Sequence, residues 1–412
     1  MENYNHFNLT HCSNIYPGNS WEEIFNNLKV NIPLIKAKLS PTQPFGIGLR
    51  LSYKAAFELS IPKNINIFKN WLYQNNCYVT TINGFVYGEF SNTSIKETVY
   101  DPDWSTKERY DFNYILILIS SMLCLPGKEI GFSTSPLGYK FGLNKPDTIL
   151  KEGSEYLLSL LELLIEIYKT EGKLIHIDFE PEADCILESI DDIVKFFNQI
   201  SLKIRCRQKM LLSKAKKLLC RHVRICYDIC HQAVQFEDHI KNFDVLNKTK
   251  IKIGKIQISS ALDIKFCQFE PNFVVNELEK FNDNIYLHQA VERKPDGTLS
   301  RFRDLPEVIH YIQNMSNSKQ DWLTWNLEGF RNVRLHFHVP IYIQNIISQK
   351  YAIFSTTYKD IIAVIEYIKH FPITSCLEIE TYTWEVLPKY LKLDLLSSII
   401  KEYEWVIKEF RK

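Results

Sequence analysis

Residues 174–180 read Leu-Ile-His-Ile-Asp-Phe-Glu, and they give the clearest local indication of the fold. Side chains along a strand alternate between its two faces. One face of this stretch is apolar, and the other carries His176, Asp178 and Glu180. Three ionisable groups on one face are costly to bury unless that face lines a polar cavity. The stretch therefore predicts a strand with one face against helices and the other toward a polar interior.

Similar short apolar stretches recur along the chain and alternate with longer amphipathic ones. This alternation is typical of a mostly parallel sheet with right-handed crossovers. Eight or nine strands favour a (β/α)8 barrel, although an open sheet remains the alternative. A capping box, Ser20 with Glu23, predicts where the first helix begins. The predicted strands are Phe7–Ser13, Gly46–Ser52, Tyr78–Asn83, Ile130–Ser135, Leu174–Glu180, Val223–Asp228, Ile253–Ser259, Arg334–Val339 and Leu377–Thr381.

The chain of 412 residues is longer than the roughly 250 that a plain barrel needs. No Gly/Ser-rich or Pro-rich linker divides it, so we predict one domain over residues 1–412. The surplus is expected in long loops and extra terminal helices. Residues 284–303 contain the turn signal Lys-Pro-Asp-Gly at 294–297, which predicts a hairpin or lid.

Charge and cysteine content exclude several classes of protein. The 49 basic and 48 acidic residues nearly cancel, which argues against nucleic-acid binding. No apolar run reaches the roughly 18 residues of a membrane span. The ten cysteines include no CxxC pair, and the N-terminal stretch Met1–Tyr16 is polar. We therefore expect reduced thiols and a cytoplasmic protein.

Residues 203–222 carry eight Lys or Arg side chains and no acid. This composition predicts a basic helical insertion with a solvated outer face. The alternative is a peripheral contact with an anionic lipid surface or an acidic partner.

Several predicted strands end in polar residues, and in a barrel these ends meet at one mouth, where active sites lie. Carboxylates and imidazoles together can hold a divalent metal ion or perform acid–base chemistry without one. The residues expected to meet there are Glu180, Asp228, His231, His336, His338, Glu378 and Glu380.

Other polar residues near these strand ends are candidates for substrate contact. His11 and Asn14 follow the first strand, Arg50 lies on the second, and Asn83 ends the third. Purely structural roles in turns are the alternative for these residues. The predicted hairpin adds His288 and Arg293.

The common nucleotide and hydrolase motifs are missing from the sequence. It contains no GxxxxGK[ST] loop, no GxGxxG after a strand and no GxSxG elbow. The sequence therefore gives little support to a nucleotide-binding loop or a serine-hydrolase elbow.

Long strings in the chain resemble the EboE family, which is linked to bacterial metabolite traffic. They run in order over residues 11 to about 388, so the resemblance covers nearly the whole chain. The strings are His11–Glu23, Pro44–Ser52, Thr81–Phe85, Cys226–Val234, His336–Pro340 and Glu378–Trp384.

The resemblance implies a xylose isomerase-like barrel, a superfamily of sugar isomerases, epimerases and metal-dependent endonucleases. It implies a divalent ion (Mn, Zn, Mg or Co), a small-molecule metabolite as ligand, and other proteins of the same gene cluster as partners. Glu180 matches the superfamily's first glutamate ligand, followed by Glu182 near the substrate. Asp228 with His231 matches its Asp-x-x-His element, and Glu378 its last glutamate.

The superfamily's remaining histidine falls at Gln257, which is a departure and a weaker ligand. His336, His338 or His288 could supply the missing imidazole. By analogy with the superfamily's isomerases, Glu180 and Glu378 would exchange a proton with the substrate, with His231 beside them. The alternatives are a non-catalytic metabolite-binding or scaffold protein and a metal-dependent hydrolase.

Overall fold

The computed structural model describes residues 7–88, 96–265, 269–316, 331–348 and 351–412. Eight of its strands form one parallel sheet in the order β1-β14-β7-β6-β5-β4-β3-β2. They are β1 (Asn8–His11), β2 (Phe45–Arg50), β3 (Cys77–Asn83), β4 (Glu129–Thr134), β5 (Leu174–Phe179), β6 (Val223–Asp228), β7 (Ile253–Ile258) and β14 (Cys376–Ile379).

The two outer strands of this sheet meet, so the sheet closes on itself. Cys12, just after β1, forms a parallel bridge with Gly48 of β2. A Cβ atom on Gly48 would lie 2.5 Å from the backbone oxygen of His11 and 2.3 Å from Glu378 Oε1. Glycine is therefore required at this point of closure. The predicted (β/α)8 barrel is confirmed, and the alternative of an open sheet is excluded.

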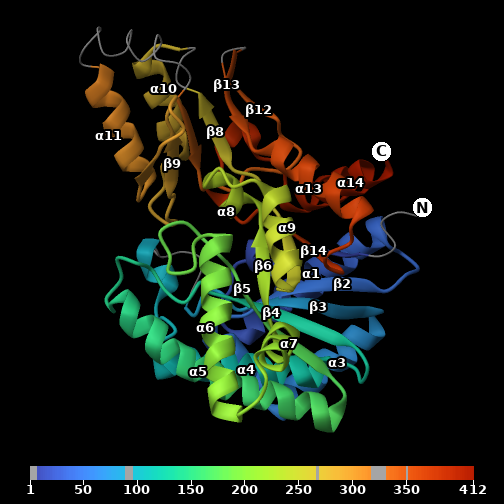
Figure 1. The fold of residues 1–412 in the computed structure, drawn as a ribbon. Coiled ribbons are helices and arrows are strands. Elements are labelled where there is room, and N and C mark those ends of the chain that lie inside the picture. The colour runs from blue at the N-terminus through green and yellow to red at the C-terminus, as the bar shows by residue number, and fades with distance from the viewer. Residues whose placement is uncertain (1–6, 89–95, 266–268, 317–330, 349–350) are drawn as a thin grey trace.

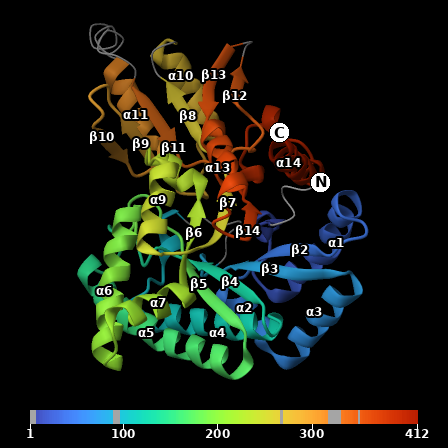
Figure 2. The same cartoon turned by 45° about the vertical axis from the view of Figure 1, so that its right-hand side comes forward.

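Helices surround the barrel and bury the outward-facing apolar residues of its strands (Figures 1 and 2). The capping box of Ser20 and Glu23 is present at the start of the first helix, as predicted. The helices are α1 (Trp21–Leu39), α2 (Tyr53–Ser60), α3 (Pro62–Gln74), α4 (Lys107–Leu123), α5 (Pro146–Glu171), α6 (Ile190–Gln208), α7 (Leu212–His222), α8 (Ile229–Val234), α9 (His239–Thr249), α13 (Tyr358–His370) and α14 (Leu395–Arg411).

A second, antiparallel sheet is inserted between β7 and β14, in the order β10-β9-β11-β8-β13-β12. It has a hydrophobic core of its own together with α10 and α11, and it stands beside one end of the barrel (Figure 1). The elements of this inserted sheet are β8 (Leu262–Lys265), α10 (Pro271–Leu278), β9 (Ala290–Arg293), β10 (Leu299–Phe302), α11 (Leu305–Ser316), β11 (Asn332–Leu335), β12 (Asn345–Ser348) and β13 (Tyr351–Thr356).

The inserted sheet corrects one predicted strand and changes where the surplus length lies. Residues 334–339 were predicted as a barrel strand, but only Arg334 and Leu335 are in a strand, and that strand is β11. β11 pairs antiparallel with β8 and β9, away from the barrel. Apolar and polar side chains alternate in the same way in the parallel barrel and in the antiparallel inserted sheet. The alternation therefore could not show to which of the two sheets residues 334–339 belong.

The predicted hairpin at residues 284–303 contains an antiparallel pair of strands. In it, β9 and β10 pair with Leu299 opposite Arg293.

The basic residues 203–222 cover the end of α6 and all of α7, which belong to the ordinary crossover between β5 and β6. Lys203 and Arg207 there form ion pairs with Glu155 of α5. Contact of this segment with lipid or a partner stays a prediction.

In the described part of the chain, every helix is too short or too polar to span a bilayer. The nine cysteines described in the structure are free thiols.

Candidate metal centre and active site

Three carboxylates meet at the C-terminal ends of three barrel strands. Glu180 follows β5, Asp228 ends β6 and Glu380 follows β14, and one carboxylate oxygen from each lies within 4.8 Å of the others. All three side chains are buried. Burial, and then repulsion between the carboxylates, raises the pKa of Glu180 and of Glu380 well above its usual value. This group of carboxylates therefore favours either bound cations or bound protons.

Hydrogen bonds hold two of the three carboxylates, those of Asp228 and Glu380, in place. Asp228 caps the N-terminus of α8, where its Oδ1 accepts from the backbone N–H of His231 at 3.0 Å and from Ser259 Oγ at 2.7 Å. Glu380 Oε1 accepts from the side-chain amides of Asn14 at 2.8 Å and Asn83 at 3.2 Å. Asn14 and Asn83, predicted to contact substrate, are therefore seen to orient a carboxylate.

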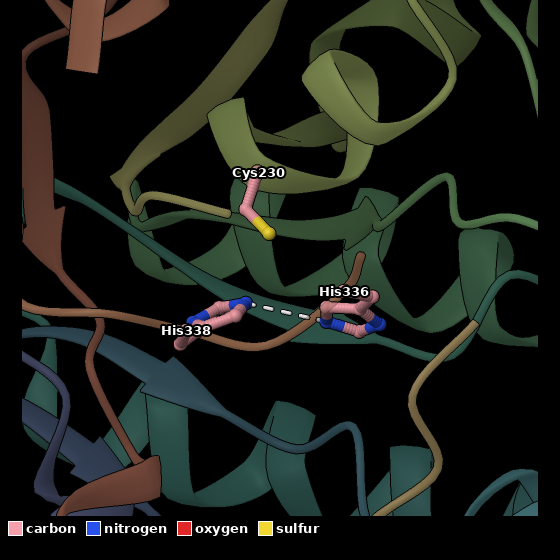
Figure 3. Close-up of side chains that lie close together, drawn as sticks. All are labelled: Cys230, His336 and His338. Carbon is pink, nitrogen blue, oxygen red and sulfur yellow. Dashed lines mark hydrogen bonds between the residues drawn. The ribbon is translucent and has the colours of Figure 1, made fainter. Parts of the chain in front are cut away.

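Three imidazoles lie beside the carboxylates, and two of them come from the inserted sheet. His231 is in α8 of the barrel, whereas His336 and His338 are in the segment that follows β11. His336 Nε2 lies 3.2 Å from His231 Nε2 and 3.3 Å from His338 Nε2. Figure 3 shows the imidazoles of His336 and His338 turned toward each other.

The second ring nitrogens of His336 and His338 determine which tautomer each ring adopts. His338 Nδ1 donates to the backbone carbonyl of Glu380 at 2.8 Å, and His336 Nδ1 donates to Gln289 Oε1 at 2.8 Å. The orientation of the Gln289 amide follows from its Nε2, which donates to Tyr100 Oη at 2.6 Å. Carbonyl oxygens only accept, so each Nδ1 carries a proton and, in a neutral ring, each Nε2 does not.

The rings of His336 and His338 are neutral at pH 7, because burial lowers the pKa of His336 to about 4 and that of His338 to about 3. Two bare Nε2 lone pairs therefore face each other at 3.3 Å in a buried site. They cannot hydrogen-bond to each other. The other polar groups near His336 Nε2 are His231 Nε2 at 3.2 Å and the hydroxyl of Tyr382 at 3.5 Å. A divalent cation bound by both nitrogens turns this close approach into two metal–ligand bonds, so these residues fit a metal ion.

Donor atoms suitable for a metal ion form four overlapping groups among the described residues. In each group, one ligand atom from each side chain lies within 4.8 Å of the others. The groups are Glu180, Asp228 and Glu380; Asp228, His231 and His338; Glu182, His231 and His336; and Cys230, His336 and His338.

A pocket opens above these groups and contains about 640 Å³ of space free of protein atoms, including the part open to solvent. Tyr100, Tyr286 and Tyr382 contribute aromatic rings to its lining, which also includes Lys96. The predicted site residues that line the pocket are Asn14, Arg50, Asn83, Glu180, Glu182, His231, His336 and Glu380.

The structure places Glu378 and Gln257 deeper in the barrel than the pocket. Glu378 Oε2 lies 2.6 Å from the ammonium of Lys255, and both side chains are fully buried. Gln257 Oε1 accepts from Cys226 Sγ at 3.0 Å. Neither residue belongs to the four donor groups or lines the pocket described here.

Three more predicted residues lie outside the pocket. His11 is held between the hydroxyls of Tyr403 at 3.1 Å and Tyr16 at 2.9 Å. His288 helps to hold the backbone of His336, since its Nδ1 donates to the backbone oxygen of His336 at 2.9 Å. Arg293 stacks over the ring of Phe236, with 4.4 Å from its guanidinium carbon to the ring centroid.

Three residues that shape the centre were not predicted from the sequence: Cys230, Lys255 and Gln289. Cys230 lies between Asp228 and His231, which were both predicted, so its position in the sequence could have indicated a third residue of the site. Lys255 shares the inward face of β7 with Gln257, so strand parity also pointed to it. For Gln289 the sequence offered no signal, because its position depends on the inserted sheet.

The fold and the site together define a (β/α)8 barrel with a candidate metal centre at the C-terminal ends of its strands. No model of a known protein family and no curated protein matches the chain. The solved structures similar to it include an IolI protein with a bound zinc atom, at 13% identity, TM-score 0.46 and 98% coverage of both chains.

Another is a xylose isomerase-like TIM barrel protein from Mycobacterium smegmatis in complex with magnesium, at 10% identity and TM-score 0.49, covering 100% of this chain and 98% of the other. A third is 3-keto-D-glucoside 4-epimerase from E. coli, at 13% identity and TM-score 0.34, covering 61% of this chain and 79% of the other. All three TM-scores are below 0.5, so the barrel assignment rests on the strand order of this chain.

Proposed function

We propose that this protein is a divalent-metal enzyme that moves a proton on a carbon beside the carbonyl group of a small polyhydroxy compound, as sugar isomerases and epimerases do. The observation that carries the proposal is the 3.3 Å approach of His336 Nε2 to His338 Nε2, in rings whose Nδ1 atoms contact carbonyl oxygens, beside a pocket lined by Glu180 and Glu380. Bound there, a divalent ion would polarise a carbonyl oxygen of the substrate.

The residues that would hold the ion come from the imidazoles and from Asp228, which shares a donor group with His231 and His338. Glu180 and Glu380 are the carboxyl groups placed to take and return a proton, since both line the pocket and Glu378 does not. Glu180 Oε2 is buried and has no hydrogen-bond partner among the described residues, so it is available to a substrate. The amides of Asn14 and Asn83 hold Glu380 for the same task.

We also propose that the chain belongs to the EboE family and acts in bacterial metabolite traffic. The strings quoted above support this assignment, and three of them contribute directly to the site. Asp228 and His231 come from one string, His336 and His338 from another, and Glu380 from a third.

Solvent-proton exchange tests the enzymatic proposal. The metal-loaded protein is incubated in deuterated water with a panel of aldoses and ketoses, and deuterium on the carbon beside the carbonyl is followed by NMR. We expect incorporation into at least one sugar, and Glu180→Gln and Glu380→Gln should each slow it by about 10²–10⁴-fold. Glu129→Gln is the matched control, because Glu129 begins β4 at the opposite end of the barrel and pairs with Arg224.

The absence of exchange across the panel, in protein that holds its metal, would contradict the isomerase proposal. The same protein would then be tested as a metabolite-binding protein, which predicts sugar binding without conversion. Exchange that survives both glutamate substitutions would remove Glu180 and Glu380 from the proposed roles.

A further inference from the structure

Four consecutive residues at the start of α8 contain three side chains that could ligate a metal. Asp228, Cys230 and His231 each belong to at least one of the four donor groups. The local backbone holds them together, since the backbone N–H of Cys230 donates to Ser259 Oγ at 2.9 Å. Ser259 Oγ in turn donates to Asp228 Oδ1 at 2.7 Å. The position of Cys230 is therefore tied to β7 and to the carboxylates.

The side chain of Cys230 lies close to the imidazoles of His336 and His338, which are in the segment after β11. Its sulfur and one nitrogen each of His336 and His338 lie within 4.8 Å of one another, and all three residues are buried. Figure 3 shows the sulfur pointing from α8 toward the two rings. The nearby thiol of Cys226 is also buried but donates to Gln257 Oε1 at 3.0 Å. Of these two neighbouring cysteines, Cys230 is the one that belongs to a donor group with the imidazoles.

The 3.3 Å approach of His336 Nε2 to His338 Nε2, in rings whose Nδ1 atoms contact carbonyl oxygens, favours a bound cation independently of the cysteine. Thiolate sulfur with imidazole nitrogen is a donor set that selects zinc and similar soft ions, whereas magnesium prefers oxygen ligands. A site made of Cys230, His336 and His338 is therefore expected to prefer zinc to magnesium.

We propose that Cys230 is a thiolate ligand of the ion held by His336 and His338, and that the site consequently takes zinc in preference to magnesium. This inference rests on the proposed metal centre. When the ion binds, the S–H bond of Cys230 breaks, a sulfur–metal bond forms and the proton passes to solvent, so charge and atoms balance.

Cobalt(II) serves as a spectroscopic probe of this ligand. Titrating the metal-free protein with cobalt should produce visible d–d bands from four-coordinate cobalt and a near-ultraviolet charge-transfer band from the thiolate. Cys230→Ser should lose the near-ultraviolet band and bind zinc at least about tenfold more weakly, since even partners outside the first shell contribute about 10–100-fold. Cys226→Ser, the matched control, should keep the band.

Each result is decisive for one of the two proposals. Visible bands without the near-ultraviolet band in the wild type would overturn the role of Cys230 and leave the metal centre standing. A band that persists in Cys230→Ser would assign the thiolate to another cysteine and overturn the inference. No binding of cobalt or zinc at all would overturn the metal centre itself.

One measurement needs no variant, and it decides the matter if Cys230→Ser fails to fold. X-ray absorption at the zinc edge of the wild-type protein should show a sulfur neighbour at about 2.3 Å. A first shell made only of nitrogen and oxygen would overturn the inference.

Discussion

Replacing Lys255 by methionine is expected to destabilise the protein by about 3–5 kcal/mol. The ammonium of Lys255 lies 2.6 Å from Glu378 Oε2, and both side chains are fully buried inside the barrel. Burial acts against the charge of Lys255, but attraction to Glu378 outweighs it and raises the pKa of Lys255 well above its usual value. Removing the lysine would leave a buried carboxylate without its counter-ion, which is the costly case. Urea unfolding followed by circular dichroism measures the change.

Two further variants separate the charge from the packing at this position. The double variant Lys255→Met/Glu378→Leu should recover most of the lost stability, because replacing both partners of a buried pair by apolar groups is often neutral. Lys107→Met is the control, since Lys107 and Asp111 form an exposed pair and the loss should stay below about 1 kcal/mol. A small effect of Lys255→Met, similar to that of the control, would show that the buried pair is not ionised.

The second large effect is expected from the metal ion itself. An ion present at about a thousand times its dissociation constant stabilises the folded state by about 4 kcal/mol. We therefore expect added zinc to raise the melting temperature of the metal-free wild type. His336→Ala and His338→Ala should each lose most of this rise. Differential scanning calorimetry of each variant, with and without zinc, measures the difference.

His310→Ala is the matched control for the histidine variants. His310 is an exposed histidine of α11 that lies within hydrogen-bond distance of Asn314 and belongs to none of the four donor groups. Its zinc-dependent rise should equal that of the wild type. An equal rise in all four proteins would place the stabilising ion somewhere other than the proposed centre.

The barrel could be predicted because strand parity is a strong local signal. In β5, the alternation of Ile175, Ile177 and Phe179 with ionisable residues separates the face packed on helices from the inward face. The eight barrel strands all fall within predicted stretches or within one or two residues of them. Parallel strands surrounded by helices repeat this pattern, so each stretch could be assigned without reference to the others.

Depth along the barrel could not be predicted from parity. Glu378 in β14 and Glu380 just after it have the same parity, but only Glu380 lines the pocket, and Glu378 pairs with Lys255 deeper in the barrel. How deep a residue lies in the barrel depends on the register between neighbouring strands, for example the pairing of Glu378 in β14 with Gln257 in β7. Stagger is a property of the closed barrel and is not contained in any one strand.

The inserted sheet was the larger failure of prediction. Several of its strands are only four residues long, too short for alternation to be distinctive, and its pairings span up to about a hundred residues of sequence. His336 and His338 were predicted to end a barrel strand, and they reach the same mouth from a non-strand segment after β11. His336 and His338 were therefore correctly expected at the mouth, but the barrel strand from which they were predicted is absent among the described residues.

The most direct test of the central claim is the metal content of the purified protein, by elemental analysis of the wild type and of the double variant His336→Ala/His338→Ala. The account predicts about one divalent ion per wild-type chain and its loss in the double variant, with the fold retained in circular dichroism. A wild type that stays empty when zinc, manganese, cobalt or magnesium is supplied, or a double variant that keeps its ion, would contradict it.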